Sequence, residues 1–276
     1  MSIVKIGGGQ GFWGDSPDAA IHMAKTADLD YIACDYLAEL TMSILARQKM
    51  KNPEAGYARD FIGLYDACAE DAWRKNIGIL TNAGGMNIEK CADAVVDVAR
   101  KHGLNGLKVG CVLGDDLTDK IDELYARGVT FENMDGVGDF KDIKDKIVNA
   151  NVYFGHEPTV EALEAGANVV ITGRSTDSAL FLAPICTRWG GRPMTGTTWP
   201  VALWQVICLS AAVRVPVETT TMIGVVFHAW MSWDSRSLRS LITISLSPRL
   251  LTAAVLSASR AAKSSSSMRF TILQTT

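Results

Sequence analysis

The sequence predicts an α/β fold in which helices flank a mostly parallel β-sheet. Six short apolar segments alternate with segments whose apolar residues repeat at helical spacing, which is typical of consecutive β-α units. Each apolar segment ends at a cluster of glycine or polar residues. The pattern continues only to about residue 188. We therefore expect one α/β domain over residues 1–188, with an incomplete β/α barrel as the alternative fold, and a poorly structured tail over residues 189–276.

The expected strands are short apolar runs bounded by turn-forming residues, which suits strands that are buried on both faces. In chain order they cover residues 2–6, 31–34, 77–80, 107–113, 151–154 and 168–171. Ligands bind at the carboxyl ends of parallel strands, in open sheets and in barrels alike. The residues that directly follow these strands are therefore the candidate site residues.

Helices are expected between the strands. The first begins after Asp15-Ser16-Pro17, because an N-capping residue type there precedes a proline at an early helical position. The others are predicted from apolar residues spaced three and four positions apart. They cover residues 36–50, 60–75, 88–102, 117–126, 159–165 and 176–182.

The composition excludes several classes of protein. The net charge is −3 and the basic residues of the tail are scattered, whereas nucleic-acid binding needs a clustered basic face. The chain shows no uniformly apolar window long enough for a membrane span, and it opens with a strand rather than a signal peptide. The six cysteines form no C-x-x-C pair, which indicates reduced thiols rather than disulfides or zinc. We expect a cytoplasmic protein without a bound metal.

A glycine-rich turn with the spacing G-x-G-x-x-G covers residues 9–14, and Asp35 lies 21 residues after it. This spacing resembles the dinucleotide fingerprint. However, Phe12 is bulky inside the turn, and Asp15 would sit where a pyrophosphate needs free N–H groups. Three interpretations stay open: an NAD site, a loop that receives another anionic or acyl ligand, and a purely structural turn. In the second interpretation the binding residues are Gly8, Gly9, Gln10 and Gly11.

Carboxylates follow two of the expected strands. Asp35 and Glu39 lie one helical turn apart, so both can face one pocket and divide into acid and base. The alternative is that Asp35 caps the helix that begins after it. Asp115 and Asp116 most simply cap their own helix; a metal site is the lesser alternative, because no histidine or third carboxylate lies nearby in sequence.

Two other strand ends carry groups suited to anions. The turn at residues 82–85, with Asn82, Gly84 and Gly85, can offer successive backbone N–H groups, or it is only a strand-to-helix turn. Arg174 is the best candidate to grip a carboxylate or a phosphate, with an ion pair to Asp177 as the alternative. Thr176 and Asp177 share its loop. The four histidines form no ligand cluster; His156 is the one at a strand end.

Five segments at or beside the strand ends occur in a specific order. They are IGGGQGFWGD (residues 6–15), YIACDYLAE (31–39), TNAGGMN (81–87), GDD (114–116) and ITGRSTDSAL (171–180). Together they are similar to motifs of the acyclic terpene utilisation (AtuA) family, a resemblance that covers residues 1 to about 188. The family is associated with catabolism of citronellol- and geraniol-type compounds through acyl-CoA esters. His156 stands where the family leads us to expect a small residue.

The resemblance implies a protein that acts on a branched acyl-CoA or a terpenoid acid, with a CoA thioester as the possible substrate. The glycine-rich turn and residues 82–85 would hold the anionic or thioester end. Arg174 would anchor a carboxylate or phosphate, and Asp35 with Glu39 would transfer protons. The alternatives are a non-catalytic accessory subunit of an acyl-CoA carboxylase or hydratase, and an NAD(P)-dependent oxidoreductase.

The sequence changes character after Trp189. Residues 1–190 hold 28 of the 30 Asp and Glu residues, whereas the remainder holds two of them beside eight Lys and Arg. When each codon's third base is grouped with the next two, residues 206–211, 215–219 and 229–235 become compatible with HLLEC, TGGN and MDELGF. These strings resemble the family's continuation, in order. We interpret the tail as a shifted reading frame, without the binary pattern that a folded domain needs, and expect this form to be inactive.

Overall fold

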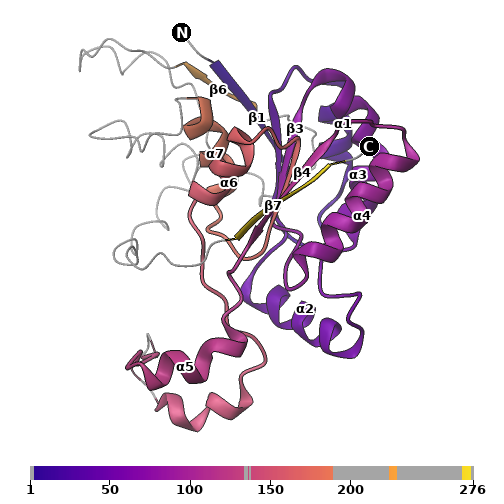
Figure 1. Cartoon of the computed structure of the whole chain (residues 1–276). Coiled ribbons are helices and arrows are strands. Elements are labelled where there is room, and N and C mark those ends of the chain that lie inside the picture. The colour runs from indigo at the N-terminus through magenta and orange to yellow at the C-terminus, as the bar shows by residue number, and fades with distance from the viewer. Residues whose placement is uncertain (1–2, 134–135, 137, 189–223, 229–268, 275–276) are drawn as a thin grey trace, which may run out of the picture.

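The computed structural model describes residues 3–133, 136, 138–188, 224–228 and 269–274. Five parallel strands form the sheet in the order β1-β2-β3-β5-β4, and two antiparallel strands pair with its edges, β6 with β1 and β7 with β4 (Figure 1). The strands are β1 (Ile3–Gln10), β2 (Tyr31–Cys34), β3 (Gly78–Thr81), β4 (Lys108–Leu113), β5 (Val169–Thr172), β6 (Gly224–His228) and β7 (Arg269–Gln274). The expected α/β class is confirmed, and the sheet is open rather than an incomplete barrel.

Helices cover both faces of the sheet (Figure 1). On one face lie α1 (Asp18–Thr26), α3 (Asp60–Lys75) and α4 (Ile88–Lys101), and on the other lie α6 (Glu157–Glu164) and α7 (Ala179–Arg188). Two further helices, α2 (Glu39–Lys51) and α5 (Ile121–Ala126), lie towards the carboxyl ends of the strands. Short 3-10 turns are η1 (Thr118–Lys120), η2 (Phe140–Asp142) and η3 (Lys144–Lys146).

Alternate residues of each strand supply two separate cores, because successive side chains of a strand point to opposite faces. Ile32 packs with α1 and α3, whereas its neighbour Ala33 belongs to the cluster with α6 and α7. Val169 and Val170 divide in the same way on β5. Both faces are buried, which is why the strands read as continuous apolar runs.

The strand order creates a switch point between β3 and β5. The chain passes from β1 through β2 and β3 to β4 with its main helices on one face, then returns to β5 and places α6 and α7 on the other face. The segments that follow β3 and β5 therefore leave these neighbouring strands towards opposite faces. In open α/β sheets a ligand crevice forms at such a point, outside the carboxyl ends of the strands.

Residues 151–154 are not the strand that the sequence predicts. Asn151 forms an isolated antiparallel bridge with Asp116, and Phe154 forms an isolated parallel bridge with Ser175. The segment is the returning half of a stem that carries residues 116–150, which we name the excursion. Val152 is 37% exposed and Tyr153 45%, so their apolar character does not reflect a buried strand. The excursion extends away from the sheet (Figure 1).

The glycines at residues 7–9 lie inside β1 rather than in a loop. A Cβ on Gly9 would lie 2.8 Å from Cys34 Sγ and 2.9 Å from the Ala20 Cβ on α1, and one on Gly7 would lie 2.7 Å from Met23 Sδ. These positions lack side chains because α1 packs directly against the strand. The expected loop therefore begins only after Gln10.

The tail enters the described structure only as β6 and β7. The proposed domain boundary at residue 188 and the shifted reading frame concern residues that lie mostly outside the described ranges, and both stay predictions. Five cysteines in the described part of the chain are buried free thiols, and burial raises the pKa of Cys34 and Cys91. Among the residues that the structure describes, no helix is long and apolar enough to cross a membrane.

Candidate functional site

Asp35 and Asn82 meet at the carboxyl ends of β2 and β3. The Asn82 Nδ2 donates to Asp35 Oδ1 at 2.6 Å, and the Asn82 Oδ1 accepts the backbone N–H of Tyr36 at 2.7 Å. Asp35 Oδ1 also accepts the backbone N–H of Leu37 at 3.2 Å. Both polar side chains are buried. The N-cap position of α2 is Ala38, so the interpretation of Asp35 as the helix cap is wrong; its carboxylate orders the turn before the helix.

The turn after β3 is packed from two sides. A Cβ on Gly84 would lie 2.7 Å from the Thr172 carbonyl oxygen, and one on Gly85, which has φ 51°, would lie 2.4 Å from Leu45 Cδ1. The backbone N–H groups of Ala83 and Gly85 donate to Thr81 Oγ1 and to the Asn82 carbonyl. The turn thus brings the ends of β3 and β5 together, while two of its N–H groups are already engaged within the chain.

Arg174, after β5, reaches across the crevice to the segment between β2 and α2. Its Nη1 donates to the Leu37 carbonyl at 3.0 Å, and its Nη2 lies 3.4 Å from Glu39 Oε1. Asp177 Oδ1 lies 3.6 Å from Nη1, so the ion pair proposed as an alternative is present but long. The Tyr153 ring lies 4.2 Å from the guanidinium carbon. The side chain is only 6% exposed, and its Nε has no hydrogen-bond partner among the described residues.

Glu39 is the exposed partner of this cluster. Its side chain is 78% exposed. The Tyr153 hydroxyl donates to its carboxylate, and this hydrogen bond, together with a backbone hydrogen bond and the nearby Arg174 charge, holds the pKa of Glu39 below its usual value. Glu39 is therefore a carboxylate at neutral pH. That state suits a base or a counter-ion, and it does not suit the acid of an acid–base pair.

Asp115, which the sequence analysis interpreted as a helix cap, lies against the loop that carries Arg174. It is 2% exposed, and burial raises its pKa to about 6. Its Oδ2 accepts the Arg174 backbone N–H at 2.7 Å and the Asn151 Nδ2 at 3.1 Å. Neither Asp115 nor Asp116 is at the N-cap position of η1, which is Leu117, but Asp116 accepts the backbone N–H and hydroxyl of Thr118 in the first turn. The signal in the sequence was its place in the Gly114-Asp115-Asp116 cluster that follows a buried strand.

The glycine-rich turn is closed by its own carboxylate. Asp15 Oδ2 accepts the backbone N–H of Gly11 at 3.0 Å, and the Asp15 carbonyl accepts from Gln10 Nε2 at 3.1 Å. Gln10 Oε1 is buried and has no hydrogen-bond partner among the described residues. The backbone N–H of Asp35 donates to the Gln10 carbonyl. The end of β1 therefore borders Asp35, but a negative charge already occupies the turn.

The remaining candidates lie on the two segments beside Arg174. The backbone N–H of Thr176 donates to the Phe154 carbonyl, which joins the β5 loop to the stem. Ser175 Oγ is buried without a hydrogen-bond partner in the described part of the chain. His156 precedes α6, and burial lowers its pKa. Within the described ranges, no three His, Cys, Asp or Glu side chains are grouped so as to hold a metal ion.

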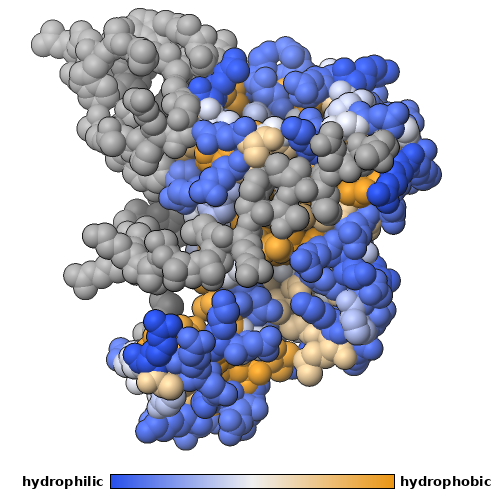
Figure 2. Space-filling model, viewed as in Figure 1, coloured by the Kyte–Doolittle hydropathy of each residue, from blue (hydrophilic) through white to orange (hydrophobic). Residues whose placement is uncertain are grey.

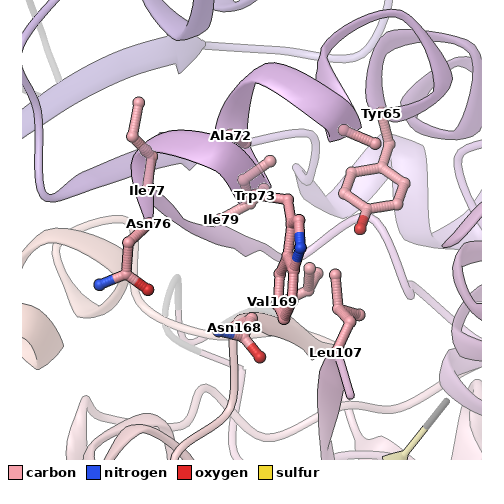
Figure 3. A pocket seen from close by; sticks show the side chains of 10 residues that line it. Tyr65, Ala72, Trp73, Asn76, Ile77, Ile79, Leu107, Asn168 and Val169 are labelled. Atoms are coloured by element: carbon pink, nitrogen blue, oxygen red, sulfur yellow. The ribbon is translucent and has the colours of Figure 1, made fainter. Parts of the chain in front are cut away.

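A small hollow lies at the amino ends of the strands, at the opposite end of the sheet from these residues (Figure 3). Tyr65 and Trp73 from α3 line it together with Asn168 and Val169 at the start of β5. Asp35 and Arg174 follow the carboxyl ends of their strands, so the length of the strands separates them from the hollow. It is therefore not part of the crevice.

The chain matches a known protein family over most of its length. The family model described as acyclic terpene utilisation family protein AtuA matches residues 4–195, more than half of the chain. The chain belongs to the AtuA family. The match confirms the resemblance and extends slightly beyond the expected limit near residue 188. No curated protein and no solved structure matches this AtuA family chain.

Proposed function

We propose that this AtuA family protein binds a branched acyl ligand of acyclic terpene catabolism, a terpenoid acid or its CoA thioester, with the anionic end at the crevice between β3 and β5. The observation that carries the proposal is Arg174. A nearly buried guanidinium lies at the switch point of the sheet, and its Nε has no partner among the described residues. A buried donor without a partner is costly, and a ligand oxygen would satisfy it.

The present counter-ions of Arg174 are replaceable. Glu39 is mostly exposed and lies 3.4 Å away, and Asp177 lies 3.6 Å away. The Glu39 carboxylate is largely in water, so it can leave the pair when a ligand anion takes its place beside the buried guanidinium and keeps that charge compensated. A ligand carboxylate bound in the bidentate geometry that guanidinium favours would make shorter and stronger hydrogen bonds. Ligand binding would therefore displace Glu39 from Arg174 at little cost.

Asp35 is our candidate for proton transfer in an acyl-processing reaction. It is buried, and Asn82 fixes its carboxylate at the end of β2. Glu39, the second residue of the expected pair, lies on the same segment, and its lowered pKa favours the role of base or counter-ion. Gln10 and the Gly11 turn border Asp35 and would form the neighbouring wall of the site.

The experiment measures binding of citronellate and citronellyl-CoA by isothermal titration calorimetry. We expect Arg174→Gln to weaken binding by about tenfold or more, because a charge-assisted hydrogen bond is lost. Arg127→Gln is the matched control, since Arg127 is an exposed arginine paired with Glu123 on α5. Equal affinities of the wild type and Arg174→Gln would contradict the proposal.

An accessory role in an acyl-CoA carboxylase or hydratase system is the second candidate. Figure 2 shows hydrophobic residues at the surface among hydrophilic ones, and Leu40 and Met50 of α2 are 73% and 76% exposed. Leu40 directly follows Glu39, so a partner protein that contacted this side chain would lie beside the crevice. Co-purification of the wild type, but not of a Leu40→Glu variant, with a pathway enzyme from the cytoplasm would support this role.

An NAD(P)-dependent activity is the least favoured candidate. The Asp15 carboxylate accepts the Gly11 N–H inside the turn, where a dinucleotide would place its pyrophosphate. Two negative groups cannot share that position without strong repulsion. Titration with NAD and NADP, followed by the fluorescence of Trp13 in the same turn, checks this point.

A further inference from the structure

Asp115 joins three segments that are far apart in the sequence. Its Oδ2 accepts the Arg174 backbone N–H and the Asn151 side-chain amide. Its carbonyl accepts the backbone N–H of Val152 at 2.8 Å. The end of β4, the loop after β5 and the returning half of the stem thus converge on one buried residue.

The fit around this junction is tight. A Cβ on Gly173 would lie 2.4 Å from both carboxylate oxygens of Asp115, so the β5 loop approaches the carboxylate as closely as a glycine allows. The Asp115 side chain is buried. Small displacements of the carboxylate would therefore move the backbone at Arg174.

The junction also determines how Tyr153 meets Arg174. Tyr153 lies two residues after Asn151 and directly after Val152, both of which Asp115 holds. Its ring stacks on the Arg174 guanidinium, and its hydroxyl reaches Glu39. One residue thus fixes the backbone of the arginine and the segment that carries the aromatic ring against it.

We infer that Asp115 is the positioning residue of the site, which sets the place of the Arg174 guanidinium through the Arg174 backbone and through the stem that carries Tyr153. The inference rests on the proposed function for its ligand, a terpenoid carboxylate. Asp115 itself need not touch this ligand. The excursion, residues 116–150, is attached to the sheet through the same junction.

The first measurement needs no ligand. In Asp115→Ala we expect amide hydrogen exchange at Arg174 and Val152 to become about tenfold faster or more. The Arg174 N–H loses its acceptor, and Val152 loses the side-chain bond that holds its neighbour Asn151 against Asp115. Asp116→Ala is the matched control, since Asp116 is the next residue and its carboxylate accepts from Thr118 rather than from Arg174. Faster exchange in this control should be confined to residues 117–120 and to Ala150, whose N–H donates to the Thr118 hydroxyl that Asp116 holds. Unchanged exchange at Arg174 in Asp115→Ala would overturn the inference.

The second measurement is citronellate affinity in a double-mutant cycle. Asp115→Ala should weaken binding by about tenfold, and the double variant with Arg174→Gln should bind no more weakly than Arg174→Gln alone, because Asp115 acts through Arg174. Asp115→Asn should keep most of the affinity, since its amide oxygen can accept the same two hydrogen bonds. Additive losses, or no rescue by Asn, would overturn the inference.

A folding failure of Asp115→Ala leaves the test intact, because Asn151→Ala removes one arm of the junction without touching the buried carboxylate. Asn151→Ala should accelerate amide exchange at Val152 and weaken citronellate binding. If either quantity stayed unchanged, the result would count against the inference. If the wild type does not bind citronellate while exchange at Arg174 depends on Asp115, the proposed ligand is wrong and the positioning of Arg174 stands.

Discussion

Buried charged groups at the carboxyl edge of this sheet are held mainly by backbone and amide groups. Asp35 accepts from Asn82 and from the Leu37 N–H, Asp115 accepts from the Arg174 N–H and Asn151, and Arg174 donates to the Leu37 carbonyl. Such bonds fix each charged side chain in place. A binding site needs its charged groups to be positioned in advance by such bonds.

Asp115 should make the stability of the protein depend on pH. Burial raises its folded pKa from the ordinary 3.8 to about 6, so the folded state binds a proton more readily than the unfolded state. Its contribution to stability is fully present below about pH 4 and is lost as the pH rises through about 6. The melting temperature of Asp115→Asn relative to that of the wild type should therefore be several degrees higher at pH 7.5 than at pH 4. A pH-independent difference would show that the carboxyl is not perturbed in this way.

At the scale of elements, close approach of a helix to a strand decides where glycine is needed. Gly9 on β1 has the Ala20 Cβ, Cys34 Sγ and Ile32 Cγ2 within 2.9 Å of the position of a Cβ. Gly63 on α3 has nothing within 4 Å. The two positions are both glycines in regular structure, but only the first is required by packing.

Alanine at these two glycines should therefore have opposite effects. Gly9→Ala should destabilise the fold by about 1–3 kcal/mol through overpacking. Gly63→Ala should stabilise it by up to about 1 kcal/mol, because alanine is the better helix former. Denaturant unfolding at equilibrium measures both. A Gly9→Ala protein as stable as the wild type would mean that α1 does not pack against β1 as described.

At the scale of the whole molecule, the parallel strands gather the candidate residues at one edge. The chain leaves β3 and β5 towards opposite faces, and the segments that carry Asp35, Asn82, Asp115 and Arg174 meet around that point. β6 and β7 pair with the two outer strands of the parallel sheet, β1 and β4. The site is thus a property of strand order rather than of any one motif.

Limited proteolysis of the expressed full chain should yield a resistant fragment that ends close to residue 188. The expectation comes from the sequence of the tail, which lacks a sustained period of 2 or 3.6 and has few acidic partners for its basic residues. Resequencing the gene around the codon for Trp189 provides a direct check of the shifted frame. A resistant fragment from residues 190–276 would show that this interpretation is mistaken.

The sequence by itself determined the fold class, the family and most of the elements. Residues 60–75 and 31–34 are a helix and a strand with the expected bounds, because their burial patterns are local and regular. The prediction of a strand at residues 151–154 was wrong, since the apolar residues of this exposed stem resemble those of a buried strand in the sequence. Strand order was beyond sequence reasoning, because neighbouring strands need not follow one another in the chain.

Only the tertiary structure decided how the candidate residues are combined. Arg174 meets Leu37 across 137 residues and Asp115 across 59, and both contacts involve backbone atoms, whose chemistry is the same at every position. No residue type marks such a contact in advance. The sequence therefore indicated only a helix cap for Asp115. The pairing of β4 with β5 places Asp115 against the Arg174 backbone, and burial at that junction raises its pKa.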